Sequence, residues 1–137
     1  MEEQFVVFKL GQEEYGLDIL KVQEIIRPLK PAKIPNSPNY VLGIIDLREE
    51  IIPIIDLKQF LNLGSWEETE ETRIIVVKQN DNALGVLVDE VEEVLRISKQ
   101  KIKSSEDLDH NINKEFINGI AKVEGRLIVL LDLAAVI

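Results

Sequence analysis

Apolar residues recur along this chain in short segments, either alternating with polar residues or in brief runs. The segments are rich in valine and isoleucine and are bounded by turn residues, which is typical of β-strands. The pattern predicts five strands in each half of the chain, with Gly11-Gln12 as the first hairpin turn. The expected strands are residues 4–10, 13–18, 23–28, 41–48, 51–56, 73–79, 83–89, 92–97, 116–123 and 126–132. Residues 57–61 and 133–137 each have the pattern of one helical turn.

The two halves of the chain resemble each other, which predicts an internal duplication. Shared valines and isoleucines are expected by chance among β-strands, whereas glycines and acidic residues that match in register are not. Placing residues 5–26 over 74–95, an offset of 69, aligns Val7/Val76, Lys9/Lys78, Gly16/Gly85, Val22/Val91 and Glu24/Glu93. Placing residues 40–57 over 116–133, an offset of 76, aligns Gly43/Gly119, Ile44/Ile120, Ile52/Ile128, Asp56/Asp132 and Leu57/Leu133. The larger second offset predicts a longer loop in the second half.

The duplication predicts an all-β fold of two similar units packed together. The repeats are residues 4–63 and 73–137, and they are joined by an acidic junction at residues 64–72. Short strands in this number suggest that each repeat forms a small closed barrel, because closure removes exposed sheet edges. Such a barrel buries little apolar surface alone, so the two should stabilise each other across an apolar seam. The sequence leaves open whether strands are exchanged between the halves.

One predicted strand, residues 51–55, is apolar on both faces and contains a proline. The apolar run predicts that this strand is covered on both sides. Pro53 has no N–H to donate to a neighbouring strand, which favours an edge position or a bulge.

Composition and charge narrow the classes of function. The chain has 16 basic and 25 acidic residues, and its net charge of −9 argues against nucleic acid or an anionic membrane surface as a partner. There is no cysteine, which excludes disulfides, thiolate metal ligands and a cysteine nucleophile. The N-terminus lacks the features of a signal peptide, and no apolar run approaches the ~18 residues of a membrane span. We therefore expect a cytoplasmic protein.

No group of residues has the pattern of a catalytic, metal or cofactor site. The single histidine, His110, has no second histidine or cysteine to support a metal site, so a solvated loop residue is favoured. Asp46, Asp56 and Asp132 are candidates for a catalytic carboxylate pair. However, Asp56 and Asp132 occupy equivalent places before a predicted helical turn, and capping of that turn explains both. We expect a protein that is not an enzyme and needs no cofactor.

Three motifs resemble those of a known family, the CheW-like domain. They are EYGLDILKVQEI at residues 14–25, GIIDLR at 43–48 followed by IPIIDL at 52–57, and GVLVDEV at 85–91. The motifs occur in the order of the family, and the resemblance spans residues 4–137. It implies a single CheW-like domain over residues 1–137, made of two five-stranded, SH3-like barrels, in agreement with the duplication.

The resemblance implies a chemotaxis adaptor, because members are adaptors, regulatory domains of the kinase CheA, or fusions to a receiver domain. The chain begins at Met1 close to the first strand and shows no kinase or receiver segment, which favours the adaptor. Such a scaffold couples chemoreceptors to the histidine kinase CheA and supports receptor control of the kinase. Its partners are the CheA regulatory domain and the cytoplasmic tip of a receptor, in arrays at the inner face of the membrane. An excised CheA domain and an enzyme with an unrecognised carboxylate site remain alternatives.

The resemblance also implies roles for individual residues. Val22 and Glu24 fall on the surface that contacts the kinase, and Arg48 falls at a position that couples receptor and kinase. Gly43 and Gly85 fall at structurally sensitive positions where backbones approach closely. Burial of Val22 in the core, and plain surface positions for Glu24 and Arg48, are the structural alternatives.

One position departs from the family pattern, since Glu49 follows Arg48 where the family has glycine. If the turn needs a positive φ, glutamate there costs roughly 1–2 kcal/mol. We expect the hairpin to adjust around Glu49, although the equivalent turn of the second half keeps Gly125.

A groove between the two barrels is the expected receptor site. The resemblance implies that the receptor offers a helical hairpin, and an amphipathic helix in an apolar groove is a recurring mode of recognition. Val86, Val88 and Val94 are the candidate lining residues, because their strands carry more apolar side chains than one barrel interior needs. The alternative is that all three valines lie in the interior.

Overall fold

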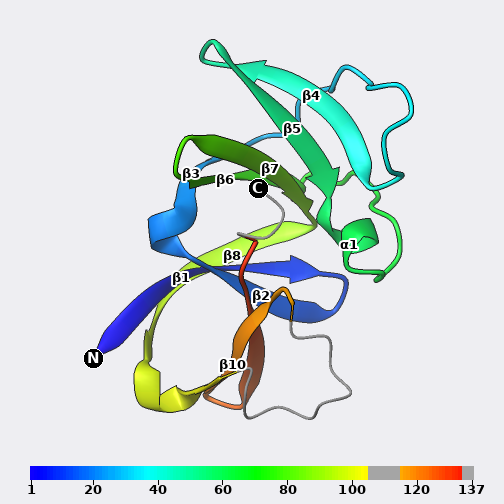
Figure 1. The fold of residues 1–137 in the computed structure, drawn as a ribbon. Helices are drawn as coiled ribbons and strands as arrows, with labels where there is room; N and C mark the ends of the chain where they lie inside the picture. Colours follow the sequence, from blue (N-terminus) through cyan, green and yellow to red (C-terminus); the bar gives the residue numbers. More distant parts are fainter. Residues whose placement is uncertain (105–114, 134–137) are drawn as a thin grey trace.

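The fold consists of two β-sheets, which form the lower and upper lobes of the molecule in Figure 1. This computed structural model describes residues 1–104 and 115–133. Sheet A has the strand order β8-β1-β2-β11-β10-β9, and sheet B has the order β3-β6-β7-β5-β4. The strands of sheet A are β1 (Glu2–Leu10), β2 (Glu13–Asp18), β8 (Glu90–Ser98), β9 (Ile102–Ser104), β10 (Ile117–Val123) and β11 (Arg126–Leu131). The strands of sheet B are β3 (Val22–Ile26), β4 (Val41–Leu47), β5 (Glu50–Asp56), β6 (Arg73–Gln79) and β7 (Asn82–Val88).

Three short helices complete the described part of the chain. They are the 3₁₀ turns η1 (Ile19–Lys21) and η2 (Lys99–Lys101) and the single α-helical turn α1 (Leu57–Phe60). The predicted all-β class and the helical turn after residue 56 are confirmed. Strand β9 and both 3₁₀ turns were not expected, and most of the second predicted helical turn lies outside the described residues, as does His110. No helix among residues 1–104 and 115–133 is long and apolar enough to cross a membrane.

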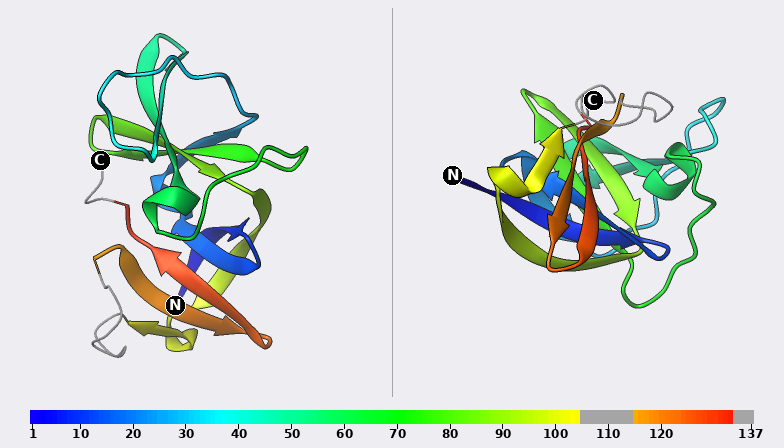
Figure 2. Two further views of the ribbon diagram at one scale, coloured as in Figure 1. Left: turned by 90° about the vertical axis from the view of Figure 1, so that its right-hand side faces the viewer. Right: turned by 90° about the horizontal axis from the view of Figure 1, so that it is seen from below.

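Each sheet contains strands from both halves of the sequence. The β1–β2 hairpin pairs with β8 and β11, and the β6–β7 hairpin pairs with β3 and β5. The pairings β2–β11 and β5–β7 are both parallel, so the two sheets repeat the same topology. The chain passes from sheet A to sheet B between β2 and β3 and returns between β7 and β8, and Figure 2 shows the two lobes from other sides. Strands are thus exchanged between the sequence halves.

Buried apolar side chains form three clusters, one between the sheets and one within each curled sheet. In β1, Val6 and Phe8 belong to the cluster between the sheets, whereas Phe5 and Val7 belong to the cluster of sheet A. In β6, the repeat equivalents divide in the same way: Ile75 and Val77 lie between the sheets, and Ile74 and Val76 lie within sheet B. Strands that are buried on both faces account for the unbroken apolar runs in the sequence.

The position of Pro53 differs from the expectation. Strand β5 lies between β4 and β7, so the edge alternative is wrong, and the bulge near Pro53 falls on the partner strand β4, where the register shifts between Val41 and Gly43. The ladder between β5 and β7 begins one residue after Pro53, at Ile54, so Pro53 leaves no gap in that ladder. Ile51 is 60% exposed, and this strand is therefore covered on both sides only in its second half.

Candidate interaction surfaces

The two charged residues singled out from the sequence meet in the structure. An Nη atom of Arg48 donates to a carboxylate oxygen of Glu24 across 3.1 Å. Glu24 lies on β3 and Arg48 in the β4–β5 turn, at opposite ends of the strand order, so the pair links the two edges of a curled sheet. The Arg48 side chain is 76% exposed and that of Glu24 20% exposed. An ion pair with so exposed a partner contributes under ~1 kcal/mol to stability.

The β4–β5 turn that carries Arg48 has a left-handed backbone. Arg48 has a φ of 53° and Glu49 a φ of 69°. Two positive φ angles in a two-residue hairpin loop are typical of a type I′ turn, whose twist matches that of the flanking strands. The expectation that the hairpin adjusts around Glu49 is therefore wrong, because strand twist fixes the turn and Glu49 follows it. The β10–β11 turn has the same form at Glu124 and Gly125, with φ angles of 50° and 80°.

Val22 occupies the boundary between core and surface at the start of β3. Its half-buried side chain packs against the cluster between the sheets. The β3–β6 ladder shifts in register between Val22 and Glu24, so Gln23 is left out of it. A bulge of this kind re-aims the side chains around it. Beyond it, Ile25 is 41% exposed, which adds an apolar side chain to the surface of β3.

Sheet A contains a similar pair of a glutamate and an arginine. The only sign of this pair in the sequence was the match of Glu93 with Glu24 in the internal alignment. Glu93 pairs with Arg126 across 3.1 Å, and Arg126 also binds Glu14 at 2.6 Å. The hydrogen bond from Arg126 lowers the pKa of Glu14, whereas burial raises the pKa of neighbouring Glu92. The β8–β1 ladder is shifted around Glu92, the repeat equivalent of Gln23. The two sheets therefore present similar charged edges.

The three valines expected to line a receptor groove lie in different environments. Val86 and Val88 are 0% and 1% exposed and belong to the cluster between the sheets. Their burial does not support a groove position, because the apolar side chains on this face of β7 pack between the two sheets. Val94 on β8 is 48% exposed and is the repeat equivalent of exposed Ile25. Of the three valines, Val94 alone offers surface to a partner.

A cavity of about 220 Å³ opens where the two sheets meet. It is lined by Leu17, Asp18, Lys21, Val77, Lys78, Gln79, Asn118, Leu131, Asp132 and Leu133. Polar residues outnumber apolar ones in this lining, and the three valines are not among them. This cavity therefore differs from the apolar groove expected at the seam.

Gly43 and Gly85 lie where chain segments approach closely. Gly43 has a φ of +142°, and a Cβ there would meet the carbonyl oxygen of Ala32, which forms an isolated bridge with Ile44. A Cβ on Gly85 would meet the tip of Ile54 and would lie 3.0 Å from a methyl carbon of Ile74. Neither position has room for a larger side chain without movement of its neighbours.

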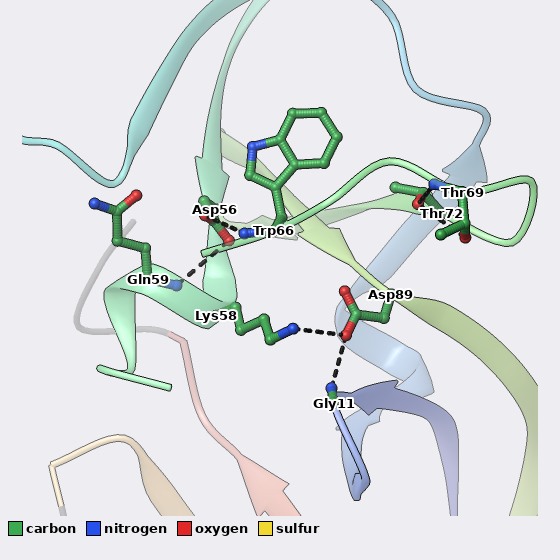
Figure 3. Close-up of polar contacts among 8 residues, drawn as sticks. All are labelled: Gly11, Asp56, Lys58, Gln59, Trp66, Thr69, Thr72 and Asp89. Carbon is green, nitrogen blue, oxygen red and sulfur yellow. Dashed lines mark hydrogen bonds and ion pairs between the residues drawn. The ribbon is translucent and has the colours of Figure 1, made fainter. Parts of the chain in front are cut away.

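Asp56 is a buried carboxylate held by backbone donors. It is 0% exposed and accepts hydrogen bonds from the N–H groups of Gln59, at 3.3 Å, and Trp66, at 3.2 Å (Figure 3). Burial raises its pKa, and the bond from Gln59 shows that it caps α1, as the sequence indicated. A carboxylate with no exposed surface is closed to a substrate. Within the described residues no cluster of three or more histidine, cysteine or acidic side chains has the arrangement of a metal site.

Comparison with known proteins gives matches over almost the whole chain. Residues 4–137 match the family model described as the CheW-like domain. The chain is 36% identical over 129 residues to the chemotaxis protein CheW of Helicobacter pylori, an alignment that covers 93% of this chain and 77% of that protein. It is 34% identical over 135 residues to CheW of Bacillus subtilis, covering 98% and 86%. The crystal structure of the scaffolding protein TtCheW from Thermoanaerobacter tengcongensis is similar, with a TM-score of 0.89, 38% identity, and coverage of 97% of this chain and 90% of that one.

Proposed function

The chain belongs to the CheW-like domain family, and on that premise we propose that it is a non-enzymatic chemotaxis scaffold that couples chemoreceptors to the histidine kinase CheA. The observation that carries this proposal is the near full-length similarity, in sequence and fold, to chemotaxis proteins and to a scaffolding protein. The partners are the regulatory domain of the kinase and the cytoplasmic tip of a receptor. The protein then works in the cytoplasm, recruited to receptor arrays at the inner face of the membrane.

The kinase-contacting surface in this proposal is the outer edge of sheet B around Val22 and Glu24. β3 is the last strand of that sheet, and it offers half-buried Val22, exposed Ile25 and the Glu24 carboxylate together. A small apolar centre with a charged rim is a common composition of protein interfaces. The ion pair with Arg48 favours one orientation of the Glu24 carboxylate before the partner binds.

Arg48 and Val94 carry the remaining contacts in this proposal. Arg48 is exposed on a two-residue turn and touches Glu24, so a contact at Arg48 acts on the kinase-binding edge. Val94 lies on β8, an edge strand of sheet A, and supplies an exposed apolar contact for the receptor. Gly43 and Gly85 have structural roles, since the tight packing around them holds the strands that bear these surfaces.

Substitution of Glu24 tests the kinase surface. Glu24→Lys reverses the rim charge, and we expect it to weaken binding of the kinase regulatory domain at least about tenfold, which corresponds to ~1.4 kcal/mol. The matched control is Glu93→Lys, which makes the same change at the equivalent place on sheet A and also breaks an arginine pair. Isothermal titration calorimetry with each variant measures both affinities. Equal affinities for the Glu24→Lys and Glu93→Lys variants would remove Glu24 from the kinase surface.

A further inference from the structure

Asp89 is the single residue between β7 of sheet B and β8 of sheet A. At the other passage between the sheets, from β2 to β3, the three residues of η1 make the connection. A one-residue joint between two strands has only two soft backbone angles, φ and ψ. Rotation about these two angles changes the orientation of one sheet relative to the other.

The side chain of Asp89 contacts groups from both sheets. Its Oδ2 accepts a hydrogen bond of 2.6 Å from the N–H of Gly11, in the β1–β2 turn of sheet A. The same oxygen accepts one of 3.2 Å from Nζ of Lys58, in the helical turn that follows β5 of sheet B. Figure 3 shows both donors converging on this carboxylate. In addition, the N–H of Asp89 donates to the carbonyl oxygen of Lys9 across 3.1 Å.

The Lys58–Asp89 ion pair is better shielded than the ion pair at the edge of sheet B, whereas the bond from Gly11 lies at an exposed position. The Lys58 side chain is 21% exposed and that of Asp89 27%, compared with 76% for Arg48. Charge-assisted hydrogen bonds in a sheltered position are stronger and less screened by salt than exposed ones. These hydrogen bonds are also directional, whereas the hydrophobic effect that holds the apolar seam between the sheets is not directional.

We infer that Asp89 and Lys58 are positioning residues that fix the orientation of sheet A relative to sheet B. The Asp89 carboxylate closes the joint by bonding to Gly11 on one side and to Lys58 on the other. The orientation sets the placement of Val94 relative to Glu24 and Arg48, a consequence that rests on the proposed function. Loss of the carboxylate removes both side-chain bonds and leaves the backbone bond to Lys9 as the remaining hydrogen bond described at the joint, so its φ and ψ are less restricted.

Distances between spin labels on the two sheets test this inference on the protein alone. The chain has no cysteine, so Gln23→Cys on β3 and Lys122→Cys on β10, both exposed, can be labelled cleanly. We expect one narrow distance distribution in the parent protein and a clearly broader one after Asp89→Ala. Lys58→Gln keeps the bond from Gly11 and should broaden the distribution less. Pulsed electron paramagnetic resonance measures all three.

Two matched substitutions within sheet B serve as controls. Lys78→Gln makes the same change as Lys58→Gln but removes a pair with Glu50 on β5, and Asp46→Ala removes an exposed carboxylate on β4. Both should keep the parent distribution. If Asp89→Ala does not fold, Lys58→Gln decides the question. Parent-like distributions for folded Asp89 and Lys58 variants would overturn the inference.

A charge swap tests whether the ion pair between Asp89 and Lys58 is by itself enough to position the sheets. Combining Lys58→Asp with Asp89→Lys restores opposite charges, but a lysine cannot accept the hydrogen bond from Gly11. We therefore expect the broad distribution to persist. A return to the narrow distribution would show that charge pairing alone positions the sheets, contrary to the inference.

Kinase activation tests the part that rests on the proposed function. Asp89→Ala should bind the kinase domain and the receptor fragment separately with parent-like affinity, yet support several-fold less receptor-dependent kinase activity. Full activity together with a broadened distance distribution would contradict this part of the inference. If the parent protein binds neither partner, the proposed function fails, while the distance measurement still decides the role of Asp89.

Discussion

At the scale of single residues, Glu49 has a backbone conformation that favours glycine. Its φ of 69° is left-handed, and the equivalent place in the second half is held by Gly125 with a φ of 80°. The side chain of Glu49 is exposed, so packing does not require a glutamate there. The turn geometry is therefore maintained by the strands on either side, at the expense of backbone strain.

Replacing Glu49 with glycine should stabilise the protein. Relief of the left-handed conformation is worth about 1–2 kcal/mol and is partly offset by about 0.5–1 kcal/mol from the greater freedom of glycine in the unfolded chain. We expect a net gain of about 0.5–1 kcal/mol in the free energy of unfolding, measured with urea. Glu13→Gly, at an exposed position in β2, should instead destabilise. A loss of stability in Glu49→Gly would show that the turn is not strained.

Residue environments were predictable where local chemistry decides them. The capping role of Asp56 follows from a carboxylate placed just before a helical turn, and the structure confirms it. The burial of Val86 and Val88 was not predictable, because an apolar run does not say whether its second face meets another sheet or a partner. The pairing of Arg48 with Glu24 was also not predictable, because it depends on how sheet B curls to bring its two edges together.

At the scale of elements, the strand pattern was predictable and the pairing was not. Alternation and turn residues located ten of the strands to within a few residues. The short β9, Ile-Lys-Ser, has too little pattern to be recognised; its counterpart in sheet B is reduced to a bridge between Ala32 and Ile44. Strand exchange was undecidable because duplicated strands have the same apolar faces, and either copy satisfies the same partner.

Packing between exchanged strands gives a prediction for Gly85. Gly85→Ala pushes a methyl group against Ile54 and Ile74, both nearly fully buried, and overpacking of this kind typically costs about 1–3 kcal/mol. Gly16 is the repeat equivalent, and a methyl there meets Leu130 at 3.0 Å with other atoms no closer than 3.5 Å. Urea unfolding should therefore show a larger loss for Gly85→Ala than for Gly16→Ala. An equal or smaller loss would mean that sheet B relaxes around the methyl group.

At the scale of the whole molecule, duplication yields two similar lobes, each with a similar edge. Each lobe has an edge strand with a glutamate held by an arginine, Glu24 with Arg48 in one and Glu93 with Arg126 in the other. The exposed apolar neighbours of these glutamates are also equivalent, Ile25 and Val94. In the proposed function these are two separate binding edges in a fixed relation, which is what a bridging scaffold requires.

Bridging of receptor and kinase is the central claim, and co-sedimentation tests it most directly. Vesicles that carry a receptor signalling fragment are mixed with the kinase and increasing amounts of this protein, and the kinase in the pellet is measured. We expect little kinase without the protein, a maximum as it is added, and a decline in excess, because surplus bridges then occupy receptor and kinase separately. Val94→Glu should abolish recruitment while binding the kinase normally in solution. Kinase that sediments equally well without the protein, or that does not respond to its concentration, would contradict the account.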